Sequence, residues 1–236
     1  MSNPTRLYDK IIKSFTHISI KILPRSVREL IKKIYSPYKI LPCRFGESLI
    51  DPERLQFLLF LLQNQIYKKL DGDVIECGVF RGGSSIRMGL LLKDLKSDKK
   101  IHAIDTFEGF PFRSKEDPER MIQYNTVLSN TDYESVKQAV KKKGADNVIL
   151  YKGECDKIFP SLNDKKFCFA HIDVDIYLSV KQCIEFLKDR MVEGGVIMFD
   201  EYNKPQAAGE TKAVNELLGK GNIVPTGAIG GYWSKK

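Results

Sequence analysis

The sequence lacks paired cysteine motifs and long hydrophobic runs. Its five cysteines are odd in number and form no C-x-x-C pair, which argues against a disulfide framework and against a zinc site. We expect them to be reduced and mostly buried as small apolar residues. The longest apolar run, from Leu55 to Ile66, is interrupted by Gln63 and Asn64 and is shorter than the roughly 20 residues that span a bilayer. We therefore expect no transmembrane helix.

The first residues of the sequence also lack the pattern of a signal peptide. Charged residues are scattered among its apolar positions, and no cleavage site of small residues follows. The sequence therefore predicts a cytoplasmic protein.

The positive charge is concentrated at one end of the chain. The formal net charge is +8, and residues 1–44 hold ten basic and two acidic residues, whereas the remainder is balanced. A neutral domain with a basic arm argues against nucleic-acid binding and favours a surface, a partner or an anionic substrate at that end. We expect two amphipathic helices in this arm, around residues 7–18 and 27–34. They could contact the inner face of a membrane peripherally, or pack on the domain or on a second subunit of a homo-oligomer.

From Asp73 onward, short β-branched runs alternate with helical stretches, a pattern typical of an α/β fold with a mostly parallel sheet. We expect a basic helical arm over residues 1–50 and one catalytic domain over 51–236. Parallel strands are expected at 73–77, 101–105, 147–152, 167–173 and 195–200. Helices are expected at 52–70, 84–95, 133–143, 180–190 and 210–218. The tail, from Asn222, predicts an antiparallel hairpin of two further strands, so that the sheet has seven. The stretch 107–132 is long for a connection, which is typical of a functional or mobile loop.

A glycine-rich turn follows the first expected strand of the sheet. Gly78, Gly82 and Gly83 lie where that strand leads into a helix, and a helix N-terminus presents free N–H groups to a negative ligand. Phe80 stands where the dinucleotide fingerprint G-x-G-x-x-G has its second glycine, which makes a pyrophosphate less favoured there. Asp105 ends the next strand, where a carboxylate can accept from ribose hydroxyls. Together they indicate an adenosine-bearing cofactor without a pyrophosphate, although an ordinary turn and a helix cap are the alternatives.

Four carboxylates follow two other expected strands. Asp173 and Asp175 end one, and Asp200 and Glu201 end the next. Because parallel strands end at one edge of the sheet, these side chains should converge beside the cofactor, unless they only cap helices or face solvent. Such hard oxygen ligands suit Mg²⁺ better than zinc, and an ion there would lower the pKa of a substrate hydroxyl while a free carboxylate takes its proton.

The three histidines contribute little to this hypothesis. His17 lies in the basic arm and His102 lies inside a strand, while His171 lies on a strand two residues before Asp173. We interpret each as structural or exposed.

Several blocks of the sequence resemble the macrocin O-methyltransferase (TylF-type) family of S-adenosylmethionine-dependent sugar O-methyltransferases. They are "GDVIECGVFRGGSS", "IHAIDTFEGFP", "YKGECDKIFPSL", "HIDVDIYLSVKQCIEFLKDRMVEGGVIMFDEYN" and "GGYWSKK". The resemblance extends from Asp71 to the C-terminus and implies a Rossmann-like class I methyltransferase fold. It also implies a sugar, a glycan or a glycosylated natural product as substrate. The family usually has Asp-Asp where this chain has Asp200 and Glu201.

The resemblance also implies roles for particular residues. The amino-acid part of the cofactor would be held by Glu76, Gly78, Gly82 and Ser84. Asp105 and Thr106 would lie at the ribose, and Gly153 to Cys155, including Glu154, near the adenine. Asp173, Asp200 and Glu201 match the metal ligands, with Asp173 also beside the cofactor, and Asp175 matches the proposed base.

Three other functions remain open from the sequence. The first is a metal-independent methyltransferase acting on a non-sugar small molecule, in which Asp173 and Asp175 work without an ion. The second is an NAD-dependent oxidoreductase, which Phe80 disfavours. The third is a non-catalytic glycan-binding or assembly subunit, which the presence of Asp173, Asp175 and Asp200 disfavours.

Overall fold

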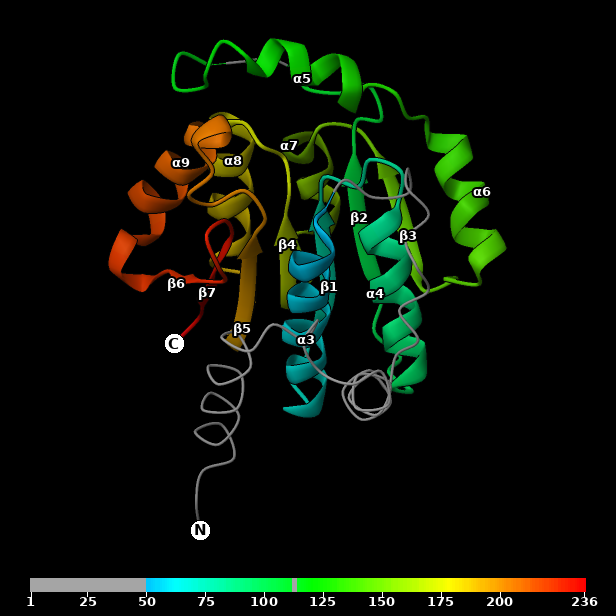
Figure 1. Cartoon of the computed structure of the whole chain (residues 1–236). Helices are drawn as coiled ribbons and strands as arrows, with labels where there is room; N and C mark the ends of the chain where they lie inside the picture. The colour runs from blue at the N-terminus through cyan, green and yellow to red at the C-terminus, as the bar shows by residue number, and fades with distance from the viewer. Residues whose placement is uncertain (1–49, 112–113) are drawn as a thin grey trace, which may run out of the picture. The chain divides into compact units, whose positions relative to one another are not determined.

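A seven-stranded sheet with the order β3-β2-β1-β4-β5-β7-β6 forms the centre of the protein (Figure 1). The structure, a computed structural model, describes residues 50–111 and 114–236. The strands are β1 (Asp73–Cys77), β2 (Ile101–Asp105), β3 (Val148–Lys152), β4 (Phe167–Ile172), β5 (Met191–Phe199), β6 (Val224–Pro225) and β7 (Gly231–Ser234). The five adjacent strands β3, β2, β1, β4 and β5 are parallel to one another. Strand β7 is antiparallel to both of its neighbours, β5 and β6. The predicted mostly parallel sheet with an antiparallel C-terminal hairpin is confirmed.

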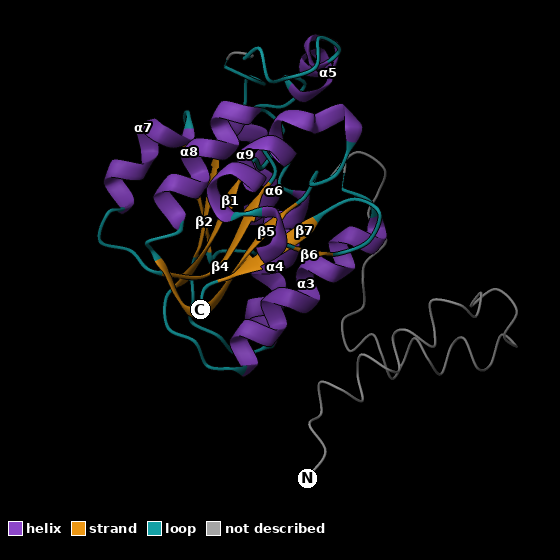
Figure 2. Ribbon diagram, turned by 90° about the vertical axis from the view of Figure 1, so that its left-hand side faces the viewer, coloured by secondary structure: helices purple, strands orange, loops and turns teal. Residues whose placement is uncertain are grey.

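Helices cover both faces of this sheet. The longer ones are α3 (Pro52–Tyr67), α4 (Gly83–Asp94), α5 (Met121–Leu128), α6 (Tyr133–Lys143), α8 (Tyr177–Leu187) and α9 (Ala208–Leu218). The short ones are α7 (Cys155–Ile158), η2 (Phe159–Leu162), η3 (Pro205–Ala207) and η4 (Lys220–Asn222). Helices α3 and α4 lie on one face, and α7, α8 and α9 lie on the other (Figures 1 and 2). The central strand β4 is therefore buried at every position.

Local sequence explains where most elements begin and end. Helix α3 begins at Pro52, with the Asp51 carboxylate accepting from the Glu53 N–H at 2.8 Å. Helix α6 begins after Asp132, which caps it in the same way, and ends at Gly144 with a left-handed backbone. These features also make the predicted bounds of α6 correct.

Several expectations for the elements differ from the structure. Strand β5 begins at Met191, before the expected 195, and helix α3 ends at Tyr67, before the expected 70. Helix α8 begins at Tyr177 and not at 180, because the Asp117 carboxylate accepts from the Tyr177 N–H at 2.7 Å. This cap comes from 60 residues away in the sequence, so local sequence gives no sign of it. The stretch 107–132 contains a helix, α5, which lies beyond the edge of the sheet where β2 ends (Figure 1).

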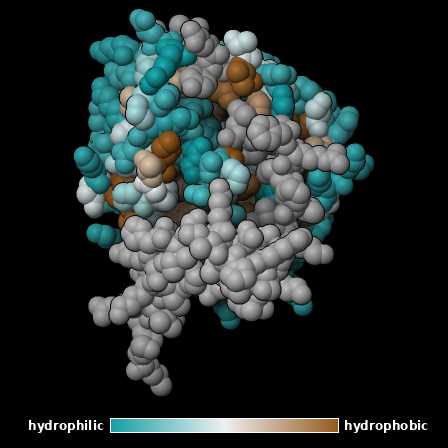
Figure 3. Space-filling model, in the orientation of Figure 1, coloured by the Kyte–Doolittle hydropathy of each residue, from teal (hydrophilic) through white to brown (hydrophobic). Residues whose placement is uncertain are grey.

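The helices and arm expected within residues 1–50 fall almost entirely outside the described residues and remain a prediction, as does the cytoplasmic location. None of the helices that the structure describes has both the length and the apolar character needed to cross a membrane. On the face shown in Figure 3, hydrophilic residues predominate among the described residues, and hydrophobic ones are scattered. The large exposed hydrophobic residues lie on four different elements: Tyr67, Val127, Ile149 and Val224.

The fold brings the glycine turn after β1 against the end of β4. Gly78 has φ +93°, and a Cβ built on it would lie 1.9 Å from the backbone oxygen of Asp173. The Asp173 N–H in turn donates to the Cys77 carbonyl at 2.8 Å. Only glycine fits this backbone contact without displacing the chain.

We predict that Gly78→Ala lowers the free energy of unfolding by about 3 kcal/mol, because it combines a backbone collision with an unfavourable φ. Urea unfolding measures this loss. The matched control is Gly221→Ala, where a Cβ would meet nothing within 4 Å. Equal stability of the two variants would show that the contact at Gly78 is not as tight as described.

Candidate active site

A cavity of about 370 Å³ opens where the chain leaves β1 and β4. These two strands are neighbours, and their connections leave on opposite sides of the sheet, which is where open α/β sheets bind ligands. Ten of the residues expected to form the site line this cavity: Gly78, Ser84, Asp105, Thr106, Gly153, Glu154, Asp173, Asp175, Asp200 and Glu201. The convergence predicted from the strand ends is therefore confirmed. The individual roles of these residues remain predictions.

Asp105 organises the glycine turn as well as facing the cavity. One carboxylate oxygen accepts from the N–H groups of Val79 at 2.7 Å and Phe80 at 2.8 Å, and the other accepts from Phe107 at 2.7 Å. Burial raises the pKa of Asp105, and the three N–H groups act against that rise by stabilising the carboxylate. Because a carboxylate offers about four acceptor sites, one stays available for a ligand hydroxyl. Thr106 is turned to its own loop and donates to the Gly109 carbonyl at 2.6 Å.

Two of the residues expected at the cofactor lie away from the cavity. Glu76 is completely buried, and its carboxylate accepts from the Ser85 hydroxyl and contacts His171 Nδ1 at 2.9 Å. Gly82 is the N-cap of α4 with φ +81°, and a Cβ there would meet the side chains of Val136 and Ile86. Neither residue is therefore part of the cavity lining, although both lie close to residues that are.

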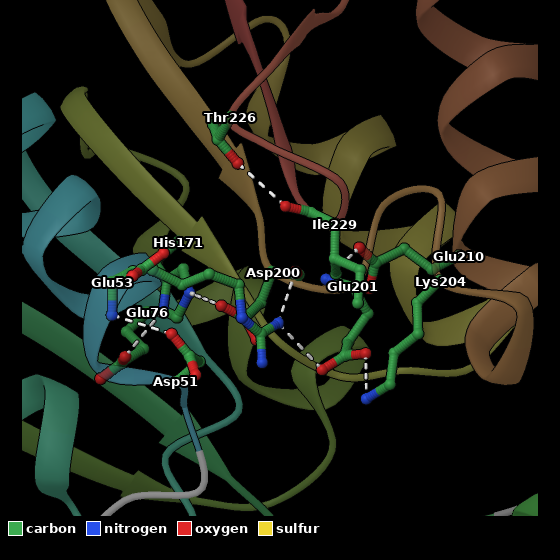
Figure 4. Close-up of polar contacts among 11 residues, drawn as sticks. Asp51, Glu53, Glu76, His171, Asp200, Glu201, Lys204, Glu210, Thr226 and Ile229 are labelled. Carbon is green, nitrogen blue, oxygen red and sulfur yellow. Dashed lines mark hydrogen bonds and ion pairs between the residues drawn. The ribbon is translucent and has the colours of Figure 1, made fainter. Parts of the chain in front are cut away.

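His171 lies completely buried between two carboxylates. Its Nδ1 faces Glu76, and its Nε2 lies 3.7 Å from Asp200 Oδ1 (Figure 4). Burial lowers the pKa of His171, but the contacts with Asp200 and Glu76 outweigh this and raise it to about 10. The expectation that His171 is structural or exposed is thus resolved in favour of a buried position. The position of His171 in the sequence does not distinguish it from an ordinary core histidine. The sequence therefore contains no indication of its contacts with Glu76 and Asp200.

The carboxylates themselves form two overlapping groups. Oxygen atoms of Asp173, Asp175 and Glu201 lie within 4.8 Å of one another, and so do ligand atoms of His171, Asp173 and Asp200. Asp175 has φ +57°, a left-handed conformation that aspartate tolerates better than most residues. Strand geometry alone would place Asp173 and Asp175 on one face of the sheet. The backbone turns between them instead, and their carboxylate oxygens still lie within 4.8 Å of each other.

Crowding of negative charge raises the pKa of these groups. Burial, followed by the charges of Asp200 and Asp175, raises the pKa of Asp173 well above its usual range. Burial and Glu201 raise the pKa of Asp175 to about 7. The pKa of Glu201 is raised by burial and by Asp200. The cluster is therefore short of positive charge.

A further carboxylate lies behind the cluster, and sequence reasoning missed it. Glu210, on α9, is completely buried, and burial together with Asp175 raises its pKa well above the usual range. Its Oε1 accepts from the Glu201 N–H at 2.9 Å (Figure 4). Glu210 thereby fixes the backbone from which Glu201 extends.

Two basic side chains supply part of the missing charge. Arg54 Nη1 donates to Asp200 Oδ2 at 2.6 Å, to the Asp200 carbonyl at 2.8 Å and to Glu201 Oε1 at 3.1 Å. Lys204 forms an ion pair with the other oxygen of Glu201 (Figure 4). Although burial lowers the pKa of Arg54, the charges of Asp200 and Glu201 raise it above its ordinary value.

Arg54 was also missed from the sequence, but a weak signal exists. It lies in the first turn of α3, where the helix dipole favours acidic side chains. A basic residue in that position indicates that a negative partner lies elsewhere in the fold. The sequence does not identify this partner, because Asp200 is 146 residues away.

Comparison with known proteins agrees with this geometry. Residues 37–224 match the family described as Macrocin-O-methyltransferase (TylF). The chain therefore belongs to this family of O-methyltransferases, and the predicted family and enzyme class are confirmed.

Curated relatives are similar at low identity. A 4'-O-methyltransferase of 8-demethyl-8-(2,3-dimethoxy-alpha-L-rhamnosyl)-tetracenomycin-C from Streptomyces olivaceus is 26% identical over 165 residues, which is 66% of this chain and 63% of that protein. The chain thus matches slightly less than two thirds of that relative's length. Mycinamicin III 3''-O-methyltransferase from Micromonospora griseorubida is 25% identical over 80% of this chain and 79% of that protein.

Solved structures share the fold. The O-methyltransferase NovP has a TM-score of 0.72 at 22% identity, covering 80% of this chain and 82% of its own. An O-methyltransferase from Bacillus cereus, solved in complex with SAH, has a TM-score of 0.53 at 16% identity, covering 89% of this chain and 90% of its own. The predicted class I methyltransferase fold is confirmed.

We predict that His171→Asn lowers the free energy of unfolding by about 3 to 5 kcal/mol, because it leaves two buried carboxylates without their cation. Glu76→Gln should also destabilise, and the double variant should lose less than the sum of the single losses, because the two residues form one pair. Urea unfolding of the four proteins gives this double-mutant cycle.

The same pair has a pH dependence of defined sign. Because the folded-state pKa of His171, about 10, lies above the usual 6.5, its stabilising contribution is complete below pH 6.5 and is lost as the pH rises through 10. The difference in the free energy of unfolding between wild type and His171→Asn should become smaller as the pH rises over that range. A difference that is constant, or strictly additive losses in the cycle, would contradict the buried ion pair.

Proposed function

We propose that the protein transfers the methyl group of S-adenosylmethionine to a hydroxyl group of a sugar with the help of Mg²⁺. The observation that carries this proposal is the shared cavity: the glycine turn and Asp105 line one part of it, and four carboxylates from the ends of β4 and β5 line another. A cofactor held at the first part would face an acceptor held at the second.

The residues of the cofactor part suit S-adenosylmethionine. The turn after β1 leads into the N-terminus of α4, whose free N–H groups suit the carboxylate of the methionine moiety. Asp105 retains an acceptor site for a ribose hydroxyl, and Gly153 and Glu154, after the neighbouring strand β3, suit the adenosine end. The absence of a second glycine at Phe80 disfavours NAD.

Methyl transfer needs a nucleophilic oxygen in line with the sulfonium. The acceptor oxygen forms a bond to the methyl carbon, the carbon–sulfur bond breaks, and S-adenosylhomocysteine leaves with the electron pair. Asp175 takes the hydroxyl proton as general base. Most of the rate comes from the position of the two substrates and from this proton transfer.

The carboxylate cluster offers the ligand type that suits a hard divalent cation, with Asp173 shared between the two groups of ligand atoms to which Asp200 and Glu201 separately belong. Asp173, Asp200 and Glu201 offer only oxygen ligands, and Asp200 Oδ1 is buried without a hydrogen-bond partner among the described residues. The raised pKa values of Asp173 and Glu201, caused by burial and by neighbouring carboxylates, support this proposal, because a bound cation would relieve the repulsion. Bound there, Mg²⁺ would polarise the acceptor hydroxyl and lower its pKa.

A specific observation favours one alternative, transfer without metal. Arg54 already contacts Asp200 and Glu201, and Lys204 contacts Glu201, so these cations could neutralise the cluster themselves. In that case Arg54 would be needed for activity and chelation would have no effect.

The acceptor class follows from the relatives and from the cavity wall. One relative is named for O-methylation of a rhamnosyl-bearing tetracenomycin, and another for O-methylation of mycinamicin III. Apolar residues of the segment between β2 and α5 and of α5 itself also line the cavity: Phe110, Pro111, Met121, Val127 and Leu128. A sugar carried by a glycan, by a nucleotide or by an apolar natural product would place its hydroxyl at the carboxylates and its remainder against this wall.

We predict that S-adenosylhomocysteine raises the melting temperature and that NAD does not, because only a ligand of the folded state stabilises it. Asp105→Asn should weaken S-adenosylhomocysteine binding roughly 5- to 150-fold, in line with about 1 to 3 kcal/mol for a buried acceptor. Calorimetric titration measures this. Asp94→Asn, an exposed change at the far end of α4, is the control. Stabilisation by NAD alone would reject the proposed cofactor.

We predict that exhaustive chelation abolishes methyl transfer from labelled S-adenosylmethionine to acceptor sugars and that Mg²⁺ restores it. Asp200→Asn should abolish transfer while S-adenosylhomocysteine still binds. Asp175→Asn should lower kcat by about 10² to 10⁴, as expected for a missing base. Full activity after chelation, together with loss of activity in Arg54→Met, would favour the metal-free alternative.

A further inference from the structure

Three cysteines that are far apart in the sequence meet at the edge of the core, where one of them, Cys155, lines the cavity. Cys77 ends β1, Cys155 begins α7, and Cys183 lies in the middle of α8. Their sulfur atoms all lie within 4.8 Å of one another, and none of them forms a disulfide. Cys168, by contrast, belongs to β4 and contacts the Asp73 carbonyl at 3.5 Å, near the other end of the sheet. The three thiols are therefore a separate cluster within the described part of the chain.

The spacing of these sulfur atoms suits a single thiophilic ion. Zinc–sulfur bonds are about 2.3 Å long, so sulfur atoms in a tetrahedral site lie about 3.8 Å apart. The three thiols need to approach one another by at most about 1 Å to reach that geometry, which side-chain rotation can supply. Soft sulfur ligands also select such ions over Mg²⁺, which prefers the carboxylates nearby.

The cluster has one member that an ion can reach. Cys155 is half-buried and lines the cavity, whereas Cys77 and Cys183 are completely buried in the apolar core behind it. An ion entering from the cavity would meet Cys155 first and leave its fourth position open to water. The thiols of Cys183 and Cys77 lower the pKa of Cys155 to about 5, whereas the pKa values of Cys77 and Cys183 themselves are raised well above the usual range. Cys155 is therefore the most acidic of the three thiols, and the other two would lose their protons only as the metal binds.

We propose that Cys77, Cys155 and Cys183 form a binding site for one thiophilic divalent cation of the Zn²⁺ and Cd²⁺ type. The site is distinct from the carboxylate cluster in its ligands, and it adjoins the cofactor part of the cavity, because Cys155 directly follows Gly153 and Glu154 in the lining. It does not depend on the proposed methyl transfer.

The test is a titration of the full-length chain, reduced with a phosphine, with Cd²⁺ in the presence of excess Mg²⁺. The ultraviolet charge-transfer band of cadmium–thiolate bonds reports binding by sulfur and is insensitive to binding by carboxylates. We expect saturation at one equivalent. Cys155→Ser and Cys183→Ser should each weaken the affinity at least tenfold, since each removes one of three ligands. Cys168→Ser is the matched control and should leave it unchanged.

Circular dichroism and urea unfolding show whether each variant is folded, and Cys155→Ser is the safest because its side chain is half-buried. A wild-type protein without the band, or a folded Cys155→Ser variant with the band at full strength and affinity, would overturn the proposal. The thiols would then serve only as packing residues.

Discussion

The structure is organised around an excess of buried negative charge at one edge of the sheet. Asp173, Asp175, Asp200 and Glu201 converge there, with Glu210 behind them, and their crowding raises the pKa of most of these groups. Such a cluster is stable only if positive charge compensates it. Arg54 from α3, Lys204 after β5 and His171 inside β4 each provide part of this compensation. In the proposed function, a divalent cation and a substrate hydroxyl complete this compensation.

The topology explains why this charge lies beside a cofactor cavity. Strands β1 and β4 are neighbours in the sheet, and the turn after β1 lies so close to the end of β4 that Gly78 has no room for a side chain. The same turn is held by Asp105, whose carboxylate accepts from three backbone N–H groups. Any shift of that turn would move both the cofactor wall and Asp173. The proposed cofactor turn and the proposed metal ligand Asp173 therefore share one piece of backbone.

Much of this arrangement could be predicted from the sequence, because it depends on local patterns. Alternating strands and helices predicted the sheet, and the rule that parallel strands end at one edge predicted that Asp105, Asp173 and Asp200 share a site. The pairing of side chains across the fold could not be predicted. His171 meets Glu76 over 95 residues, and Arg54 meets Asp200 over 146. Periodicity places each residue on an element, but it does not say which side chains of separate elements touch. The resemblance to the family implied that Glu76 lies at the cofactor, whereas the structure places its side chain in the core beside His171 and outside the cavity lining.

The account depends most directly on whether the carboxylate cluster binds a divalent cation. The decisive measurement is anomalous diffraction from crystals of the protein grown with Mn²⁺, as a substitute for Mg²⁺, and S-adenosylhomocysteine. The account predicts one anomalous peak among Asp173, Asp200 and Glu201, with Arg54 no longer bonded to Asp200 Oδ2. Cofactor bound in the cavity with no peak in the cluster, and with the ion pair between Arg54 and Asp200 intact, would contradict it.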